Sequence, residues 1–439
     1  MSMTADTPMT ADMSATATEP NQRTLLVTLT GRDRPGVTSR LLSELARVDM
    51  VVLDAEQIVL RGRLILGVLV ALTSSEAADE LALRDTLASM ARELGLEFEV
   101  AIGHGDSGLP VPGPLHVTVL GNPLRPAGLA RVAGAIAGCG ANIDRIERLA
   151  RYPVTCVELE VSGAESDLLR ARLTAEAADA GVDVAVQPSG LYRRAKHLVV
   201  MDVDSTLVQG EVIEMLAERA GCGDRVAAIT EAAMRGELDF EQSLRERVAL
   251  LAGLPESAVA AVRDSLPLTP GARTLIRTLK RLGYLVAIVS GGFTQVTDAL
   301  VADLGLDFAA ANTLEIVDGA LTGRLVGEVV DRPGKAAALE RFAAAAAVPL
   351  AQTIAIGDGA NDLDMLGRAG LGVAFNAKPA VREAADTAVN VPYLDAVLYL
   401  LGISRDEIDA ADAAGDSPAE GSHAEGSNAE GSSTEGSVS

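Results

Sequence analysis

The chain has 439 residues, of which 48% are hydrophobic, so it is long enough for two or three domains with substantial cores. Its formal net charge of −24 argues against nucleic acid or an anionic membrane as the main partner. It has no apolar run of about 18 residues and no signal-peptide pattern, and its three cysteines lack zinc-like spacing. We therefore expect a soluble, cytoplasmic protein.

Residues 1–22 are rich in Ser, Thr, Ala and Met, and we interpret them as a disordered leader. From residue 23 to residue 103 the hydrophobic pattern becomes regular and predicts a βαββαβ unit. The expected strands are residues 24–30, 51–59, 64–72 and 96–102, and the expected helices are residues 37–47 and 79–94.

The same order of elements recurs between residues 114 and 188, after a linker rich in Gly and Pro. The expected strands are residues 115–120, 142–149, 154–161 and 182–187, and the expected helices are residues 127–138 and 166–180. The chain therefore contains an internal duplication of structure, although few residues are identical between the two copies. Gly31 and Gly121 occupy the equivalent first turns.

These paired units resemble ACT domains, which have a ferredoxin-like fold and commonly sense amino acids. The resemblance rests on GRDRPGV at residues 31–37 and, more weakly, on GNP at residues 121–123. It implies a ligand at this turn, where free N–H groups and the helix dipole favour a carboxylate. The candidate regulatory residues are Gly31, Asp33, Gly36 and Gly121. The alternative is a turn that needs Gly for positive φ and Pro to start a helix, and the second copy lacks the Asp and the Pro-Gly pair.

Two carboxylates follow a short apolar run at residues 198–201, which we expect to be a buried strand of a parallel sheet. Asp202 and Asp204 share one side of this strand end, because side chains alternate along a strand. Two like charges this close repel each other unless a cation, a proton or solvent separates them. The pair is also compatible with a helix-capping loop, so other residues must decide its role.

Between residues 196 and 402, strands alternate with helices, which predicts an α/β domain with a parallel sheet. Polar groups follow the expected strands at residues 284–289 and 353–356 or open a helix; they are Ser290, Gly291, Lys335 and Asp358. Ligands bind at the carboxyl ends of the strands in such sheets, so we expect these groups to converge on one face.

Oxygen ligands alone suit a hard cation, so Asp202, Asp204 and Asp358 indicate a Mg²⁺ site. The hydroxyl of Ser290 and the ammonium of Lys335 suit the oxygens of a phosphate group. A Walker A pattern is missing from the sequence, which excludes a P-loop nucleotide enzyme.

These residues resemble the four motifs of the haloacid dehalogenase-like superfamily, in the order of that family. The motifs are DVDST at residues 202–206, SGG at 290–292, Lys335 and GDGAND at 357–362. The insertion at about residues 210–268 resembles the helical cap of phosphoserine phosphatases. The resemblance covers roughly residues 24–402 and extends to the long bacterial form with two ACT domains. It implies a Rossmann-like parallel-sheet domain with a helical cap, preceded by two ferredoxin-like domains.

The resemblance also implies a role for each residue of the site. Asp202 would be the nucleophile that forms an aspartyl phosphate, and Asp204 would protonate the leaving serine oxygen and later deprotonate water. Mg²⁺ would bind Asp202, the backbone carbonyl of Asp204 and Asp358, with Asp362 orienting its water shell. The remaining residues implied to bind substrate or phosphate are Ser290, Gly291, Lys335 and Asn361.

Two charged residues of the cap match the two charged groups that distinguish phosphoserine from most phosphate esters. Glu211 would pair with the ammonium, and Arg247 would bind the carboxylate with two hydrogen bonds. Met234 and Phe240 would cover the closed site and exclude water. For the charged pair the alternative is a solvated helix surface, and for Met234 and Phe240 it is ordinary core packing.

The expected function is Mg²⁺-dependent hydrolysis of O-phospho-L-serine to L-serine and phosphate, the last step of serine biosynthesis. We expect L-serine to regulate the enzyme through the ACT-like units, which usually pair across subunits, so we expect a homodimer or a larger homo-oligomer. Two alternatives remain: a phosphatase or phosphotransferase of the same fold for another small phosphate ester, and an amino-acid-sensing protein with an inactive catalytic half. Residues 409–439 are acidic and rich in Gly and Ser, which predicts a disordered tail.

Overall fold

The structure is a computed structural model that describes residues 23–72, 77–104, 114–190, 193, 195–235 and 237–415. Two compact units make up the chain, Met1–Val111 and Pro112–Ser439, and each is described by itself. The leader expected at residues 1–22 lies outside the described residues. No helix in the described ranges is long and apolar enough to cross a bilayer.

The first unit contains one βαββαβ domain, as the sequence predicts. Its elements are β1 (Arg23–Arg32), α1 (Val37–Leu45), β2 (Met50–Leu60), β3 (Arg63–Leu72), α2 (Ala77–Leu94) and β4 (Leu96–His104). The antiparallel sheet has the order β2-β3-β1-β4. Leu25, Val27 and Leu29 alternate along β1 and are buried, which places the core on one face of the sheet.

The second unit begins with the duplicate domain. Its elements are β5 (Leu115–Gly121), α3 (Pro126–Gly138), β6 (Asn142–Ala150), β7 (Thr155–Ser162), α4 (Ser166–Ala180) and β8 (Asp183–Pro188). These strands are antiparallel in the order β8-β5-β7-β6. The internal duplication predicted from the sequence is therefore confirmed as a repeat of element order and pairing.

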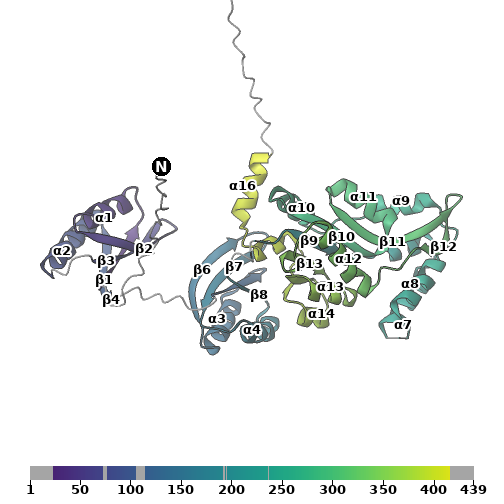
Figure 1. The fold of residues 1–439 in the computed structure, drawn as a ribbon, viewed down its shortest axis with the longest axis horizontal. Helices are drawn as coiled ribbons and strands as arrows, with labels where there is room; N and C mark the ends of the chain where they lie inside the picture. The colour runs from purple at the N-terminus through teal and green to yellow at the C-terminus, as the bar shows by residue number, and fades with distance from the viewer. Residues whose placement is uncertain are drawn as a thin grey trace, which may run out of the picture. The chain divides into compact units, whose positions relative to one another are not determined.

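A parallel sheet of the Rossmann type follows in the same unit (Figure 1). Its strands are β9 (Leu198–Asp202), β10 (Leu285–Phe293), β11 (Phe308–Val317), β12 (Ala320–Val326), β13 (Thr353–Gly357), β14 (Gly372–Phe375) and β15 (Thr387–Val389). The order is β12-β11-β10-β9-β13-β14-β15, with β12 antiparallel to its neighbour. The fold class expected from the sequence is confirmed.

Helices cover both faces of this sheet, because the side chains of β9 alternate between two cores. Val199 and Met201 join the core with α10 (Ala272–Arg281) and α11 (Thr294–Leu304). Leu198 and Val200 join the opposite core with α12 (Arg332–Ala345), α13 (Leu363–Arg368) and α14 (Pro379–Ala384). Both faces of β9 are therefore dry, and its carboxyl end lies at the centre of the sheet edge.

The insertion after β9 forms the cap. It consists of α6 (Val212–Arg219), α7 (Gly223–Met234), α8 (Phe240–Ala249) and α9 (Glu256–Ser265). Asp239 starts α8 with a capping box. Its side chain accepts the Gln242 N–H, and the Gln242 side chain accepts the Asp239 N–H. The buried face of the cap presents Leu216, Leu244 and Val248 to the core shared with α10 and α11.

The sheets of the duplicate domain and the α/β domain are continuous, which the sequence did not predict. β15 pairs with β8 at Thr387 and Ala185, so one sheet of 11 strands runs through the second unit. Asp183 accepts the Asn390 N–H at 2.7 Å and its side-chain amide at 2.6 Å. The second ACT-like domain is thus joined to the catalytic sheet by strand pairing.

One expectation about the carboxyl end is wrong. Residues 409–415, expected to begin the disordered tail, belong to α16 (Arg405–Gly415). This helix is held because Ile408 is buried and Arg277 and Arg281 of α10 both bind Asp412. The tail beyond residue 415 lies outside the described residues.

Candidate active site

Asp202 ends the central strand β9 and lies 3% exposed at the edge of the sheet. The chain then turns sharply, because Ser205 adopts the left-handed conformation with φ 57°. This turn lets Asp204 and Thr206 remain near the strand end, where Thr206 Oγ1 lies 3.5 Å from Asp358 Oδ1. The residue pattern DVDST therefore forms a compact loop at the site.

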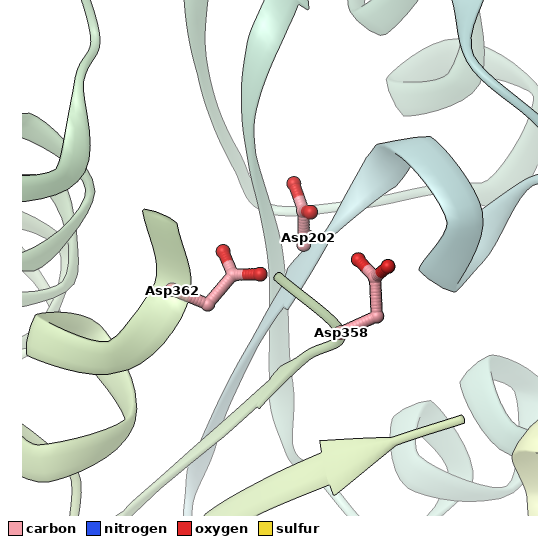
Figure 2. A group of neighbouring side chains, drawn as sticks. All are labelled: Asp202, Asp358 and Asp362. Carbon is pink, nitrogen blue, oxygen red and sulfur yellow. The ribbon is translucent and has the colours of Figure 1, made fainter. Parts of the chain in front are cut away.

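Three carboxylates gather at this edge of the sheet. Asp202, Asp358 and Asp362 each offer an oxygen within 4.8 Å of the others, and Figure 2 shows the three side chains as neighbours. Burial raises the pKa of Asp202 well above its usual value, with the Asp362 charge adding to the effect, and burial raises the pKa of Asp358 to about 6. Three oxygen donors that repel each other when ionised fit a hard divalent cation.

Lys335 joins two of these carboxylates. Its ammonium lies 2.7 Å from Asp202 Oδ1 and 2.7 Å from Asp362 Oδ1, and the side chain is 1% exposed. Burial alone would lower the pKa of Lys335, but Asp202 and Asp362 outweigh burial and raise it. The second oxygen of Asp362 accepts the Gly359 N–H at 2.9 Å. Asp362 therefore holds Lys335 beside the proposed nucleophile, a contact the sequence did not predict.

Asp204 faces away from the carboxylate cluster and toward the cap. Its Oδ1 accepts the Val212 N–H at 2.8 Å, at the start of α6, and its Oδ2 accepts the Ser290 hydroxyl at 3.0 Å. Burial raises the pKa of Asp204, although these two hydrogen bonds oppose the rise. The side chain is thus suited to exchange a proton with a group between the core and the cap.

The expected phosphate loop lies directly beside Asp204. Ser290 Oγ accepts the Gly292 N–H at 2.7 Å, which folds residues 290–292 into a tight loop within β10. A side chain at Gly291 would meet the Phe240 ring at 3.1 Å, so the first residue of α8 covers this loop. The cap is therefore closed over the loop, with the Phe240 ring against the Gly291 backbone.

Glu211 and Arg247 both come from the cap and are half-buried. Burial, with the charges of Asp204 and Asp358, raises the pKa of Glu211 to about 7, and its Oε1 accepts the Ser205 hydroxyl at 3.1 Å. Burial lowers the pKa of Arg247, against the opposing charge of Glu211. A carboxylate and a guanidinium of the cap thus share the electrostatic field of the site.

Two further residues expected at the site are Asn361 and Met234. Asn361 lies in the short helix Ala360–Asp362 after β13, with its Oδ1 against Gly359, where a Cβ would come within 2.1 Å of that oxygen. Met234 ends α7, and its side chain is not among those the structure describes.

The expected regulatory residues lie at or just before the first turns of the two ACT-like domains, because Gly31 still belongs to β1 and Gly121 ends β5. Gly31 lies in β1, where a Cβ would come within 2.6 Å of the Leu96 side chain, and Gly36 precedes α1 with φ 93°. Asp33 donates its N–H to Gly62 O at 2.8 Å. Gly121 lines a cleft together with Arg382, which belongs to the α/β domain of the same unit.

One buried polar residue of the site was not expected from the sequence. Asn312 of β11 is 1% exposed and hydrogen-bonds the backbone of Gly291 and of Val330. The only local signal for it is a polar residue inside the apolar run FAAANTLEIV at residues 308–317. A strand pattern gives no indication of which loop such a side chain reaches.

Comparison with known proteins decides the family. The haloacid dehalogenase-like hydrolase family matches residues 199–367, and ACT domain families match residues 23–101 and 115–187. A phosphoserine phosphatase of Streptomyces coelicolor is 62% identical over 409 residues, covering 93% of this chain and 99% of the relative. This chain belongs to the phosphoserine phosphatase family. It is therefore an enzyme of the hydrolase class.

A second relative matches nearly the whole chain, and a solved structure shares the fold of about two thirds of it. The phosphoserine phosphatase SerB2 of Mycobacterium tuberculosis is 55% identical over 399 residues, covering 90% of this chain and 97% of the relative. The crystal structure of a probable phosphoserine phosphatase from Vibrio cholerae, in unliganded form, is 38% identical with a TM-score of 0.53. It covers 68% of this chain and 88% of that protein.

Proposed function

We propose that this protein hydrolyses O-phospho-L-serine to L-serine and phosphate, with Mg²⁺ and through an aspartyl phosphate on Asp202. One observation supports this most: a carboxylate cluster, the loop at residues 290–292 and a cap bearing Glu211 and Arg247 meet at one sheet edge. The names of the full-length relatives support the substrate.

In the first step, an oxygen of Asp202 attacks phosphorus and the bond from phosphorus to the serine oxygen breaks. Asp204 gives its proton to that oxygen, and its raised pKa favours the protonated form that this requires. Lys335 holds Asp202 in place and contributes positive charge close to the transferred group. The loop at Ser290 and Gly291 would bind the phosphoryl oxygens.

In the second step, Asp204 takes a proton from water, whose oxygen attacks phosphorus and releases Asp202. The attacking carboxylate and the phosphate group are both negatively charged in the first step, and the aspartyl phosphate remains negatively charged in the second, so the site needs a cation. Mg²⁺ held by Asp202 and Asp358, two members of the carboxylate cluster, would offset that charge. The resemblance to the family adds the backbone carbonyl of Asp204 as a third ligand. Asp362 would orient the water shell of the ion while it keeps its contact with Lys335.

Selectivity for an amino-acid ester would come from the cap. Glu211 would pair with the ammonium of the substrate, and Arg247 would bind the carboxylate. We expect Arg247→Lys to raise KM for phosphoserine by about tenfold, because a lysine cannot form the two-pronged contact. Arg245 lies on the same helix but is exposed and pairs with Glu241, so Arg245→Lys is the matched control and should leave KM unchanged.

A panel of phosphate esters tests the substrate directly. Phosphoserine should be hydrolysed with a kcat/KM well above those of phosphoethanolamine, which lacks the carboxylate, and 3-phosphoglycerate, which lacks the ammonium. Equal rates on all three would favour the alternative of a phosphatase for another small ester. Transfer of the phosphoryl group to an added alcohol, measured as a new ester, would favour a phosphotransferase.

We also propose that the enzyme is a cytoplasmic homodimer regulated by L-serine through its ACT-like domains. The edge strand β2 exposes Val51, Val52, Ile58, Val59 and Leu60, which favours burial against a second copy. All three cysteines are free, as expected in a reducing compartment. Light scattering should give the mass of a dimer, and calorimetry on the full chain should detect serine binding; a monomer without binding heat would refute both proposals.

A further inference from the structure

The bulge in β10 that forms the phosphate loop disrupts the pairing of β10 with β11. Val289 pairs with Ala310, but the next pair joins Phe293 to Asn312, so β10 has two more residues than β11 between the two pairs. Bulged residues leave backbone groups without ladder partners, and a buried carbonyl without a hydrogen bond is costly. Gly291 O is a carbonyl of this bulge, and its hydrogen-bond donor is a side chain.

Asn312 is that donor. Its Nδ2 donates to Gly291 O at 2.8 Å, while its Oδ1 accepts the Val330 N–H at 2.7 Å. Val330 immediately precedes Asp331, the N-cap residue of α12, whose carbonyl accepts the Lys335 N–H at 2.8 Å. A single amide therefore joins the phosphate loop to the segment that positions Lys335.

The hydrogen bonds continue from the loop to Asp204, each pointing in the same direction. The peptide group whose carbonyl Asn312 holds also carries the Gly292 N–H, which donates to Ser290 Oγ at 2.7 Å. Ser290 Oγ in turn donates to Asp204 Oδ2 at 3.0 Å. Aligned hydrogen bonds in a buried site reinforce one another, so turning the amide of Asn312 would disturb the whole series.

We propose that Asn312 is a positioning residue for the reaction, which fixes the Gly291–Gly292 peptide and the Lys335 helix relative to each other. It acts through the loop and does not touch substrate in this role. The inference rests on the proposed function, because it takes residues 290–292 to be the phosphate-binding loop. The proposal has a specific consequence. Changing Asn312 should weaken the binding of the phosphate group, which inorganic phosphate reports, and not the binding of the serine part of the substrate.

Two substitutions separate the hydrogen bonds of the amide. Asn312→Asp keeps the size and the acceptor for the Val330 N–H but replaces the donor to Gly291 O with an oxygen that repels it. Asn312→Leu removes both hydrogen bonds at nearly constant volume. We expect each to lower kcat/KM about 10²-fold, because a small displacement of a reacting group has that effect. The Ki of inorganic phosphate should rise with both.

Gln295 provides the matched control. It is a half-buried amide on α11 that also bridges the backbone of β11, with Nε2 donating to Leu314 O at 2.9 Å and Oε1 accepting the Leu314 N–H at 3.4 Å. Gln295→Leu should lower the melting temperature as Asn312→Leu does, but it should leave kcat, KM and the phosphate Ki unchanged.

The experiment measures melting temperature, kcat, KM and phosphate Ki on the full chain with Mg²⁺. The proposal is overturned if both Asn312 variants lose stability but keep wild-type kcat and phosphate Ki, since a purely structural residue would behave in that way. If Asn312→Leu does not fold, Asn312→Asp decides alone. Failure of the proposed function is a different outcome: the wild type would not hydrolyse phosphoserine, and the phosphate Ki would then be measured against p-nitrophenyl phosphate.

Discussion

At the scale of single residues, the site is defined by carboxyl groups whose ionised form is disfavoured by burial. Burial raises the pKa of Glu211 to about 7 and that of Asp358 to about 6, and it also raises the pKa of Asp202 and Asp204. Such a cluster is stable only when protons, Lys335 or a cation offset its charge. The pH and metal dependence of the enzyme should follow from this property.

Glu211 should give phosphoserine a pH dependence that simpler esters lack. Only the ionised carboxylate binds an ammonium, so kcat/KM for phosphoserine should fall as the pH drops below about 7, where Glu211 takes up a proton. p-Nitrophenyl phosphate has no ammonium and should not show this additional fall. Glu211→Gln should remove the difference between the two profiles, and superimposable profiles in the wild type would contradict the assignment.

Mg²⁺ should stabilise the protein more at pH 7.5 than at pH 5.5. The folded-state pKa values of Glu211 and Asp358 lie above their usual values, so the folded protein binds more protons than the unfolded chain. Without metal, their contribution to stability is therefore lost as the pH rises from about 4 to 7. A bound cation restores this stability only at pH values at which the carboxylates are ionised.

The measurement is a melting temperature with EDTA and with saturating Mg²⁺ at both pH values. We expect a rise of about 5 °C at pH 7.5, the shift that ligand at roughly 100 times Kd gives a domain of this size. Asp358→Asn should abolish most of the rise. An equal shift at both pH values, or one that survives Asp358→Asn, would contradict the metal assignment.

Much of the site could be predicted at this scale, and the reason is topological. Asp202, Ser290 and Asp358 follow strands whose carboxyl ends meet at one edge, so their convergence follows from the alternation of strands and helices. The bond from Lys335 to Asp362 and the position of Asn312 could not be predicted, because both depend on side-chain packing between elements far apart in sequence.

At the scale of elements, the cap helix α8 closes on the loop at residues 290–292 through one aromatic ring. Phe240 begins α8, and its ring fills the space that a side chain at Gly291 would need. The helix also packs on β12, where a Cβ at Gly323 would come within 3.1 Å of Ala249 O. The close packing of α8 on the sheet therefore depends on glycine at two positions, Gly291 of β10 and Gly323 of β12.

Gly291→Ala should hinder closure by displacing the Phe240 ring. We expect KM for phosphoserine to rise about tenfold, since an overpacked contact costs on the order of 1–3 kcal/mol. Phe240→Ala should also raise KM, because the site then admits water.

The double variant separates the clash from other effects of the new methyl group. Removing the ring leaves Gly291→Ala nothing to displace, so the two effects should be strongly non-additive, as in a double-mutant cycle. Additive changes in KM would show that the methyl group acts on phosphate binding and not on the cap.

At the scale of the whole molecule, a buried ion pair fastens the second ACT-like domain to the catalytic domain. Arg193, between the two domains, binds Glu158 of β7 through both terminal guanidinium nitrogens, one of them at 3.1 Å. Its Nε donates to Leu400 O at 3.4 Å. His116 Nδ1 lies 3.1 Å from the same carboxylate. Burial alone would raise the pKa of Glu158, but His116 and Arg193 hold it at about 2.

Arg193→Ala should destabilise the second unit by about 3–5 kcal/mol, because it leaves Glu158 buried without its main partner. Calorimetry of the full chain should show this as a lower melting transition for the second unit, with the first unit unchanged. Arg131→Ala is the control: Arg131 is an exposed residue that pairs with Glu176, and its loss should cost less than about 1 kcal/mol. Equal losses for the two variants would refute the importance of the buried pair.

The sequence indicated the two ACT-like domains and the catalytic domain. It did not indicate how the second ACT-like domain is joined to the catalytic domain. Hydrophobic periodicity is a local signal, and it predicted the order of strands and helices that the structure has in both ACT-like domains. The pairing of β15 with β8 joins segments about 200 residues apart through a single pair, Thr387 and Ala185, and no local pattern marks such a contact. Regulation should therefore be tested on the full chain, since the second ACT-like domain shares its sheet with the enzyme.

The central claim is that Asp202 carries the phosphoryl group released from phosphoserine. The most direct measurement is the rate of serine release from phosphoserine by the wild type with Mg²⁺, with EDTA and by Asp202→Asn with Mg²⁺. We expect turnover only in the first case. When the phosphoryl group of the substrate carries a label, the trapped phosphoenzyme should carry that label on Asp202. Undiminished turnover by Asp202→Asn, or label on another residue, would contradict the mechanism.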